Sequence, residues 1–273
     1  MTTRERNLQR IKQLRLMDDD FMKIVFEDNI PIVEYVLQVI LQNKDLKVIS
    51  MSVQKERKNI KEHSVIFDVY AEDSTGKPYD IEIQRADKGA VSQRARYNSS
   101  MLDAGLLPKN DEYENLKDSY VIFITENDVL KAGLPIYTIE RYIKELNQPF
   151  NDGSHILYVN GAYKADNDIG NLMNDFRAEN SSEIKSTLLA ERVRYFKETQ
   201  GGNDSMCKIW EDVRNEGIEQ GIEQGIEQGI EKGAKTKALE TAQLLLKKGK
   251  LTVDEIAEVT GLTVEEVKEL AVD

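Results

Sequence analysis

Cysteine, histidine and tryptophan are scarce in this 273-residue chain, which has one cysteine, two histidines and one tryptophan. The single cysteine, Cys207, excludes an internal disulfide and a cysteine-based zinc cluster. His63 and His155 are too few and too far apart in sequence to suggest a histidine site. The disulfide-rich and zinc-cluster classes of protein are therefore excluded.

Long apolar runs are also absent. No stretch approaches the roughly 18 apolar residues that a membrane span needs. The first 17 residues, MTTRERNLQRIKQLRLM, carry cations but lack the continuous apolar segment of a signal peptide. Apolar residues make up 40% of the chain and charged residues 32%, which is ordinary for a globular protein. We expect a cytoplasmic protein with no membrane partner.

The net charge of −12 argues against a general polyanion binder. The charge is unevenly distributed, however, and a nuclease is not excluded. Residues 1–17 carry five cations against one acid. A second basic cluster follows the central acidic segment and consists of Arg85, Lys88, Arg94 and Arg96.

The segment from Val65 to Ala86 predicts a β-hairpin. Two alternating apolar strands, at 65–72 and 78–85, flank the turn Ser74-Thr75-Gly76. A three-residue hairpin loop usually ends in a residue with positive φ, which glycine adopts without steric cost. This turn pairs Asp73 with Lys77.

Counting outward from that pair places Asp68 directly opposite Glu82, with Gln84 on the same face as Glu82. Opposed Cβ atoms in a sheet lie about 5 Å apart. Two carboxylates held that close repel each other unless a cation lies between them or one of them holds a proton. The hairpin therefore indicates a divalent-metal site, although two solvated acids on an open sheet face would give the same pattern.

The rest of the first 200 residues predicts an α/β fold with helices on both sides of a mixed sheet. Apolar spacing indicates helices within 19–42, with Pro31 opening a second one, then at 92–106 and across 165–200. Further strands are expected at 47–54, 119–125 and 155–160. The segment Gly201 to Asp204 is expected to break the chain before a new helix at Met206 to Glu216.

Residues 217–233 form the four-residue repeat GIEQGIEQGIEQGIEKG. On a helix this period places the glycines in one winding row and the isoleucines in the next. Each glycine costs a helix about 1 kcal/mol relative to alanine, which makes the isolated helix weak. The two rows nevertheless allow close approach of another helix, so we favour self-association as a homo-oligomer over a free linker.

The C-terminal residues predict a helical hairpin. Thr252 with Glu255 and Thr263 with Glu266 have the spacing of capping boxes, each opening a short amphipathic helix. The arrangement is helix-turn-helix-like, but residues 251–273 carry seven acids and one base. A helix that reads DNA has to approach phosphates, so packing or assembly is the favoured role.

The order of these segments resembles the PD-(D/E)XK nuclease superfamily and, within it, the Rpn family of recombination-promoting nucleases, which are also described as transposases. The resemblance covers most of the chain. It is carried by DDDFMKIVFEDN (18–29), FDVYAEDSTGKPYDIEIQRAD (67–87), QRARYNSSMLDAGLL (93–107), DSYVIFITENDVL (118–130), LPIYTIER (134–141) and the glycine-repeat tail.

The resemblance implies that Asp68 and Glu82 are the metal-binding acids and that Gln84 occupies the superfamily's lysine position. It further implies substrate-binding roles for Arg94, Arg96 and Tyr97, where the family has an R-x-R-Y-Y pattern. The second tyrosine of that pattern is Asn98 here.

Four carboxylates have open roles. Asp20 matches a family position without an assigned function, and the run Asp18 to Asp20 is most simply a helix N-terminus favoured by the macrodipole. Asp80 lies on the face of Glu82 and is either a third ligand or a neighbour at the rim.

The implied activity is metal-dependent DNA cleavage. Asp68 and Glu82, with the backbone carbonyl of Ile83, would hold Mg²⁺ or another divalent cation such as Mn²⁺ or Ca²⁺. Gln84 would orient the attacking water but supplies no positive charge. The implied core is a restriction-endonuclease-like mixed sheet flanked by helices, with an α-helical C-terminal extension.

The expected domains are a nuclease-like domain at 1–200, a helical glycine-repeat segment at 201–236 and the helical hairpin at 237–273. The alternative function is a catalytically weak or inactive nuclease-fold protein that binds DNA or serves assembly. A purely structural oligomer built on the repeat would have no affinity for nucleic acid.

Overall fold

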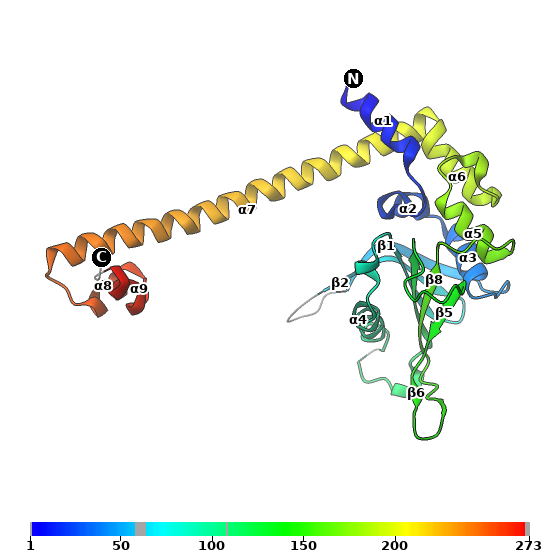
Figure 1. Cartoon of the computed structure of the whole chain (residues 1–273), viewed down its shortest axis with the longest axis horizontal. Coiled ribbons are helices and arrows are strands. Elements are labelled where there is room, and N and C mark those ends of the chain that lie inside the picture. The colour runs from blue at the N-terminus through cyan, green and yellow to red at the C-terminus, as the bar shows by residue number, and fades with distance from the viewer. Residues whose placement is uncertain (1, 58–63, 108, 271–273) are drawn as a thin grey trace. The chain divides into compact units, whose positions relative to one another are not determined.

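The computed structural model describes residues 2–57, 64–107 and 109–270. The chain divides into two compact units, Met1–Cys207 and Lys208–Asp273. Helix α7 (Gln200–Lys248) begins in the first unit and continues through the second. Figure 1 shows the elements of each unit.

The first unit is an α/β structure built on a six-stranded mixed sheet, as the sequence predicts. Its strands follow the spatial order β1-β2-β3-β4-β8-β5. The β3–β4 and β4–β8 pairs are parallel, and the other pairs in the sheet are antiparallel. The sheet strands are β1 (Val48–Arg57), β2 (Val65–Asp73), β3 (Pro78–Gln84), β4 (Ser119–Thr125), β5 (Ile136–Ile139) and β8 (Ser154–Asn160). A separate small ribbon pairs β6 (Tyr142–Ile143) with β7 (Gln148–Pro149).

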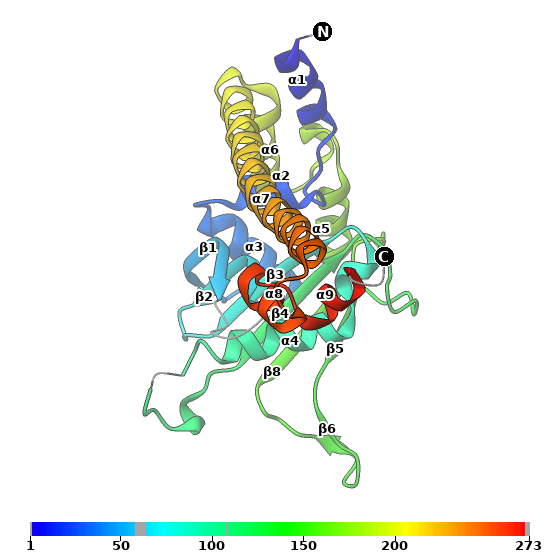
Figure 2. The ribbon, with the colours of Figure 1, turned by 90° about the vertical axis from the view of Figure 1, so that its left-hand side faces the viewer.

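Helices lie on both sides of this sheet. Helix α4 packs against β4 and β8 on one side, and α2, α3, α5 and α6 pack together on the other (Figures 1 and 2). The helices of the first unit are α1 (Thr3–Gln13), α2 (Asp19–Phe26), α3 (Ile30–Ile40), α4 (Ser92–Asp103), α5 (Asp168–Arg177) and α6 (Thr187–Glu198). Short 3₁₀ turns are η1 (Asp87–Ala90), η2 (Tyr113–Asn115) and η3 (Ser181–Glu183).

The β2–β3 hairpin has the predicted register. The backbone N–H of Asp73 donates to the carbonyl of Lys77 at 3.0 Å, and Gly76 has a φ of +81°. The ladder continues outward to the pair Val69–Ile81. The paired ladder ends there, and beyond it the backbone N–H of Asp68 donates to the side chain of Glu82, so the two expected partners do meet at the end of the hairpin.

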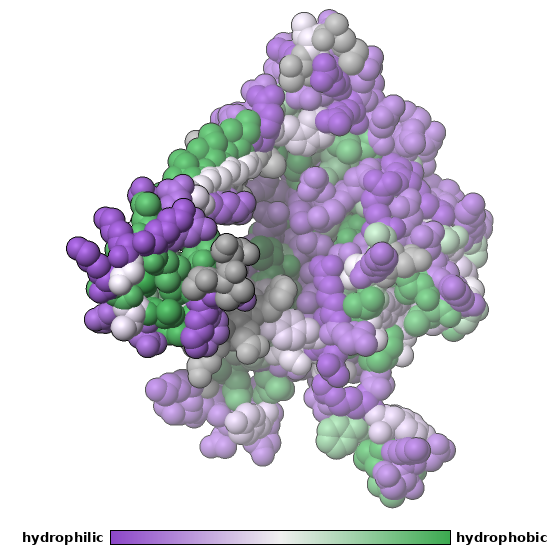
Figure 3. All heavy atoms as spheres, turned by 60° about the vertical axis from the view of Figure 1, so that its left-hand side comes forward, coloured by the Kyte–Doolittle hydropathy of each residue, from purple (hydrophilic) through white to green (hydrophobic). Residues whose placement is uncertain are grey.

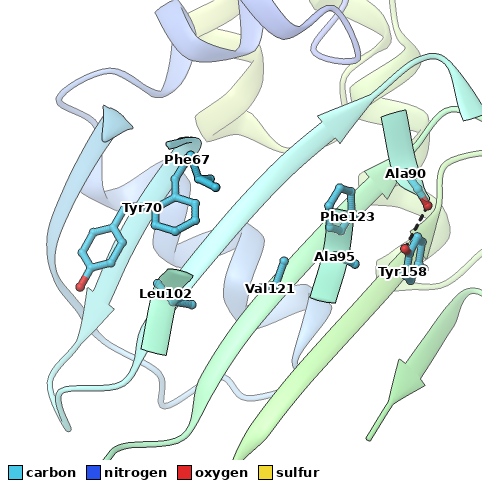
Figure 4. Close-up of a cluster of buried hydrophobic side chains, with 9 residues drawn as sticks. Phe67, Tyr70, Ala90, Ala95, Leu102, Val121, Phe123 and Tyr158 are labelled. Atoms are coloured by element: carbon cyan, nitrogen blue, oxygen red, sulfur yellow. Dashed lines mark hydrogen bonds between the residues drawn. The ribbon is translucent and has the colours of Figure 1, made fainter. Parts of the chain in front are cut away.

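The α4 side of the sheet is closed by an apolar cluster that includes Phe67, Leu102 and Phe123 (Figure 4). The ring of Phe123 stacks on that of Tyr158 with 5.4 Å between centroids, and the Tyr158 hydroxyl donates to the carbonyl of Ala90 at 3.0 Å. These contacts hold α4 and η1 on the sheet next to β3. The backbone from which the hairpin acids project is therefore embedded in a packed core.

The sequence correctly predicts most elements and misses several. Pro31 stands in the first turn of α3, as expected, while Asn29 accepts a hydrogen bond from the backbone of Ile32 as the N-cap. The edge strand β5 and the small ribbon were not predicted, because their short, half-exposed segments lack apolar alternation. Helix α1 was not predicted either, although Thr2 and Glu5 form a capping box.

The predicted break at Gly201 to Asp204 is wrong, because α7 begins at Gln200 and passes through it. The interruption lies at Thr199, between the end of α6 and the start of α7. The hydroxyl of Thr199 accepts from the backbone N–H of Gly202 at 3.1 Å. A Cβ at Gly202 would lie 2.0 Å from the carbonyl oxygen of Tyr195. This glycine therefore permits close approach to the end of α6 and does not end a helix.

In the second unit, the end of α7 packs with α8 (Val253–Thr260) and α9 (Val264–Leu270) around Ala242, Ile256 and Val267. Both predicted capping boxes are confirmed by hydrogen bonds: Glu255 accepts from the Thr252 backbone at 2.7 Å, and Glu266 accepts from the Thr263 backbone at 3.0 Å. Gly261, at a φ of +70°, ends α8.

The repeat lies in the middle of α7 as regular helix. Its isoleucines, Ile218, Ile222, Ile226 and Ile230, are each more than half exposed. Figure 3 shows them as a green strip beside a pale row of glycines on the long helix. Within the described part of the chain, no helix is long and apolar enough to cross a membrane.

We predict that Phe123→Ala destabilises the protein by about 3–5 kcal/mol, because it opens a cavity at a side chain with no exposed surface. Urea unfolding measures the change. Phe150→Ala, at a phenylalanine that is 57% exposed, is the matched control and should change stability by less than about 0.5 kcal/mol. Equal losses in the two variants would contradict this description of the core.

Candidate functional site

Three acids from the hairpin are buried close enough together to interact. Asp68 projects from β2, while Asp80 and Glu82 project from β3 two residues apart and therefore on one face. Asp80 and Glu82 have no exposed surface, and Asp68 is 7% exposed. The alternative of two solvated acids on an open sheet face does not describe this arrangement.

Where the backbone ladder of the hairpin ends, the carboxylates of Asp68 and Glu82 accept hydrogen bonds from backbone N–H groups of the opposite strand. The backbone N–H of Asp68 donates to Oε1 of Glu82, and the backbone N–H of Ile83 donates to Oδ2 of Asp68, both at 3.4 Å. Each acid therefore anchors the opposite strand. At 3.4 Å both bonds are long, but they link the two acids across the end of the ladder and bring the Ile83 backbone to the site.

Asp80 is the third acid and is held by a residue whose role the sequence left open. The Asn98 amide on α4 donates to Oδ2 of Asp80 at 3.3 Å. The other oxygen, Oδ1, is buried and has no hydrogen-bond partner. Asp80 interacts electrostatically with Glu82 and Asp68 and keeps one buried oxygen without a hydrogen bond.

Helix α2 brings two further charges, Lys23 and Asp19, whose place at the site the sequence analysis did not predict. The ammonium of Lys23 lies 2.9 Å from Oδ1 of Asp68 and 2.8 Å from Oδ2 of Asp19. Asp19 and Lys23 share a helix face because they are four residues apart. Asp19 also has a buried oxygen, Oδ1, without a partner.

The run Asp18 to Asp20 does begin a helix, but its three acids differ in position. Asp20 is exposed, and Asp19 is the residue directed to the site. Asp18 is the N-cap residue, and its carboxylate accepts from the Arg15 backbone instead of capping the helix. Helix periodicity with Lys23 was the signal that could have singled out Asp19.

Of the predicted substrate-binding residues, Arg94 lies at the acids. Its guanidinium contacts Oε2 of Glu82 at 2.5 Å and donates to the carbonyl of Gly89 at 3.2 Å. Arg96 is exposed and, two residues further along α4, points to a different side of the helix. Asn98, four residues after Arg94, shares the face of Arg94. The structure therefore brings Arg94 and Asn98 to the acids, while Arg96 lies on another side of α4.

Tyr97 lies at the border of the site, on α4. It is 37% exposed and lines a cavity of about 500 Å³ together with Ile66, Gln93, Arg94 and Asn98. The cavity therefore adjoins the two α4 side chains that hold Glu82 and Asp80.

Gln84 faces the acids from the end of β3. Its amide nitrogen lies 3.5 Å from Oε2 of Glu82. Its side chain packs so closely on η1 that a Cβ at Gly89 would lie 1.8 Å from the Gln84 amide oxygen. Gly89 is therefore needed to admit Gln84.

Part of the predicted basic cluster is neutralised. Arg85 contacts Asp18 at 2.6 Å and Glu126 at 3.2 Å, and Arg15 contacts Glu126 at 2.8 Å. His63 lies outside the described residues. The positive charge next to the acids therefore comes from Lys23 and Arg94.

Burial and mutual repulsion shift the ionisation of the cluster. Burial and the neighbouring Asp68 raise the pKa of Glu82 to about 7, despite Arg94. Burial and the charges of Glu82 and Asp68 raise the pKa of Asp80 well above its usual value. Burial and Asp19 also raise the pKa of Asp68, although Lys23 opposes the shift. The site therefore favours a bound cation or bound protons.

Burial acts on Lys23 in the opposite direction. It would lower the pKa of the ammonium, but hydrogen bonds and charge from Asp19 and Asp68 outweigh it, and the pKa is raised. Lys23 therefore carries a full positive charge at neutral pH.

The donor set fits a hard divalent cation. Carboxylate oxygens are the ligands that Mg²⁺ and Ca²⁺ prefer, and Asp80 presents a buried oxygen with no other partner. Among residues 2–57, 64–107 and 109–270, however, no group of three or more acid, histidine or cysteine side chains already forms a metal-binding set. Lys23 and Arg94 instead hold one oxygen each of Asp68 and Glu82.

A family model described as PD-(D/E)XK nuclease family transposase matches residues 15–164, which is more than half of the chain. The match includes α2, the hairpin and α4. Comparison with curated proteins and with solved structures gives no match.

We predict that the metal-free protein loses stability as the pH rises from about 5 to 8. The folded state binds a proton on Glu82 up to a pKa of about 7, whereas the unfolded state releases it near the usual 4.5. This difference corresponds to about 3 kcal/mol lost across that window. Unfolding in urea with a chelator present, over the pH range, measures it.

Glu82→Gln should reduce this slope, because the amide does not titrate, while Asp68 and Asp80, whose pKa values are also raised, account for the slope that remains. Glu34→Gln is the control, since a hydrogen bond from Lys47 lowers the pKa of Glu34 and its stabilisation therefore persists above pH 5. An undiminished slope in Glu82→Gln would assign the pH dependence to other groups.

Proposed function

The chain belongs to the PD-(D/E)XK nuclease family transposases, and on that premise we propose that it is a metal-dependent DNA endonuclease. The observation that carries the proposal is the burial of Asp68, Asp80 and Glu82 in one cluster, with Asp68 and Glu82 each bonded to the opposite strand. A protein gains nothing in stability from three crowded acids, so their arrangement points to a cationic ligand.

Asp68 and Glu82 would hold the cation, together with the Ile83 carbonyl and the unpartnered oxygen of Asp80. Mg²⁺, Mn²⁺ or Ca²⁺ fits this set of oxygen donors. A divalent ion in such a site lowers the pKa of a bound water and stabilises charge on the scissile phosphate.

Gln84 would orient the attacking water through its amide. It lies beside Glu82 and is held in place by its packing on Gly89. A neutral amide neither removes a proton efficiently nor balances the charge that develops on phosphate. The chain's cationic side chains must therefore supply that balance.

Arg94 would contact the DNA backbone at the acids, since its guanidinium already lies there and is 39% exposed. Tyr97 would contact the nucleotide next to the scissile bond from the adjoining cavity. Arg96, on another side of α4, would contact a phosphate further along the strand. Phosphate contacts of this kind position DNA without reading its sequence.

Self-association through the repeat is also part of the proposal. The isoleucine row on α7 is more than half exposed at every position, and added Cβ atoms at the repeat glycines would meet no neighbouring atom. A second copy of this helix could approach closely along these two rows. We propose a homo-oligomer that forms there.

One observation favours the second candidate, a nuclease-fold protein that binds DNA without efficient cleavage. Gln84 is neutral at the position that faces the acids, and Lys23 and Arg94 already neutralise part of the cluster. Absence of cleavage by the wild type with any divalent cation, together with retained DNA binding, would establish that alternative.

We predict that the purified protein nicks or linearises plasmid DNA with Mg²⁺ or Mn²⁺, and that Asp68→Ala and Glu82→Ala each lower the rate at least about 100-fold. Asp118→Ala is the matched control, because Asp118 bonds Lys77 at the other end of the hairpin. This control should cleave at the wild-type rate. Cleavage that survives both acid substitutions would mean that the hairpin is not the catalytic site.

A further inference from the structure

Lys23 is the most enclosed cation at the acid cluster. Its side chain is 14% exposed, and its ammonium bridges Asp19 on its own helix and Asp68 on β2. Its neighbours in α2 on both sides, Met22 and Ile24, are buried. Buried neighbours therefore hold the backbone of Lys23 in place, while its ammonium group lies among the acids.

The two cations of the site differ in freedom. Arg94 is tied to both Glu82 and the Gly89 carbonyl, and its planar guanidinium favours such a fixed arrangement. Lys23 ends in a compact ammonium on a flexible four-carbon stem. Of its two partners, Asp19 belongs to the same helix and Asp68 to β2.

A divalent cation bound at Asp68 would compete with Lys23 for its carboxylate. The ammonium now occupies Oδ1 of Asp68, whose other oxygen accepts from the Ile83 backbone. A metal ion on this carboxylate would repel the ammonium and take its place. Asp19 would still hold Lys23 at the site, since it contacts the ammonium independently.

We propose that Lys23 is a catalytic residue that neutralises Asp68 in the metal-free protein and, once a divalent cation binds there, contacts an oxygen of the scissile phosphate. The inference rests on the proposed nuclease function. The ammonium keeps its proton throughout and balances the negative charge that develops on the phosphate. It thereby supplies the positive charge that Gln84 lacks.

The alternative is a structural ion pair that fastens α2 to β2. The two roles predict different effects on metal affinity. If Lys23 competes with the metal, its removal strengthens metal binding while cleavage slows. If Lys23 only fastens the helix, its removal loosens Asp68 and metal binding weakens or stays the same.

The test compares Lys23→Met and Lys23→Gln with the wild type in the full chain. Calorimetric titration with Mn²⁺ measures metal affinity, and plasmid cleavage at saturating Mn²⁺ measures the rate. We expect metal affinity to rise about tenfold, because a neighbouring positive charge is removed. We expect cleavage to fall about 100-fold, because charge stabilisation at the phosphate is lost.

Two further variants control for structure. Lys23→Arg keeps the charge and should recover part of the cleavage with wild-type metal affinity. Lys47→Met removes another lysine that bonds a carboxylate at 2.9 Å, that of Glu34, and should change neither measurement. Thermal melting identifies any variant that fails to fold. If Lys23→Met does not fold, Lys23→Gln replaces it in the test, because its amide can still form hydrogen bonds.

Unchanged or weaker Mn²⁺ binding in a folded Lys23→Gln protein would overturn the inference, as would cleavage at the wild-type rate. These outcomes leave the proposed function intact, because the wild type would still bind metal and cleave. A wild type that neither binds Mn²⁺ nor cleaves would overturn both the proposed function and the role of Lys23.

Discussion

Repulsion between buried carboxylates is the constraint on which the site depends. The end of the hairpin brings Asp68 to Glu82, and the alternation of β3 places Asp80 on the face of Glu82. In a medium of low dielectric, three ionised acids at this spacing are unfavourable unless protons or cations compensate. The raised pKa values, the two flanking cations and the unpartnered oxygen of Asp80 all follow from that one arrangement.

The surrounding fold holds the three acids close together, so that their mutual repulsion cannot be relieved by movement. The apolar cluster around Phe123 holds α4 and η1 against the sheet, so the acids cannot move apart without disturbing the core. Lys23 from α2 and Arg94 from α4 reach the cluster from different helices and neutralise part of it. A stable core thus maintains a site that is itself electrostatically strained, which is the expected condition of a cation-binding centre.

The local parts of this site were predictable from the sequence and the long-range parts were not. A glycine with positive φ fixes the hairpin register, and strand alternation then brings Asp68, Asp80, Glu82 and Gln84 together. Lys23 and Asn98 were missed because their roles depend on how α2 and α4 pack on the sheet. The prediction of a break at Gly201 and Gly202 was wrong for a related reason. Gly202 is required by close packing against the end of α6, which the helix propensity of glycine does not reveal.

The most direct test of the central claim is a crystal structure of the wild-type protein grown with Mn²⁺, examined for anomalous scattering. We expect an anomalous peak within about 2.5 Å of carboxylate oxygens from both Asp68 and Glu82. A fully ordered hairpin with no peak there, and with Lys23 and Arg94 still bonded to the two acids, would contradict a metal centre at this site.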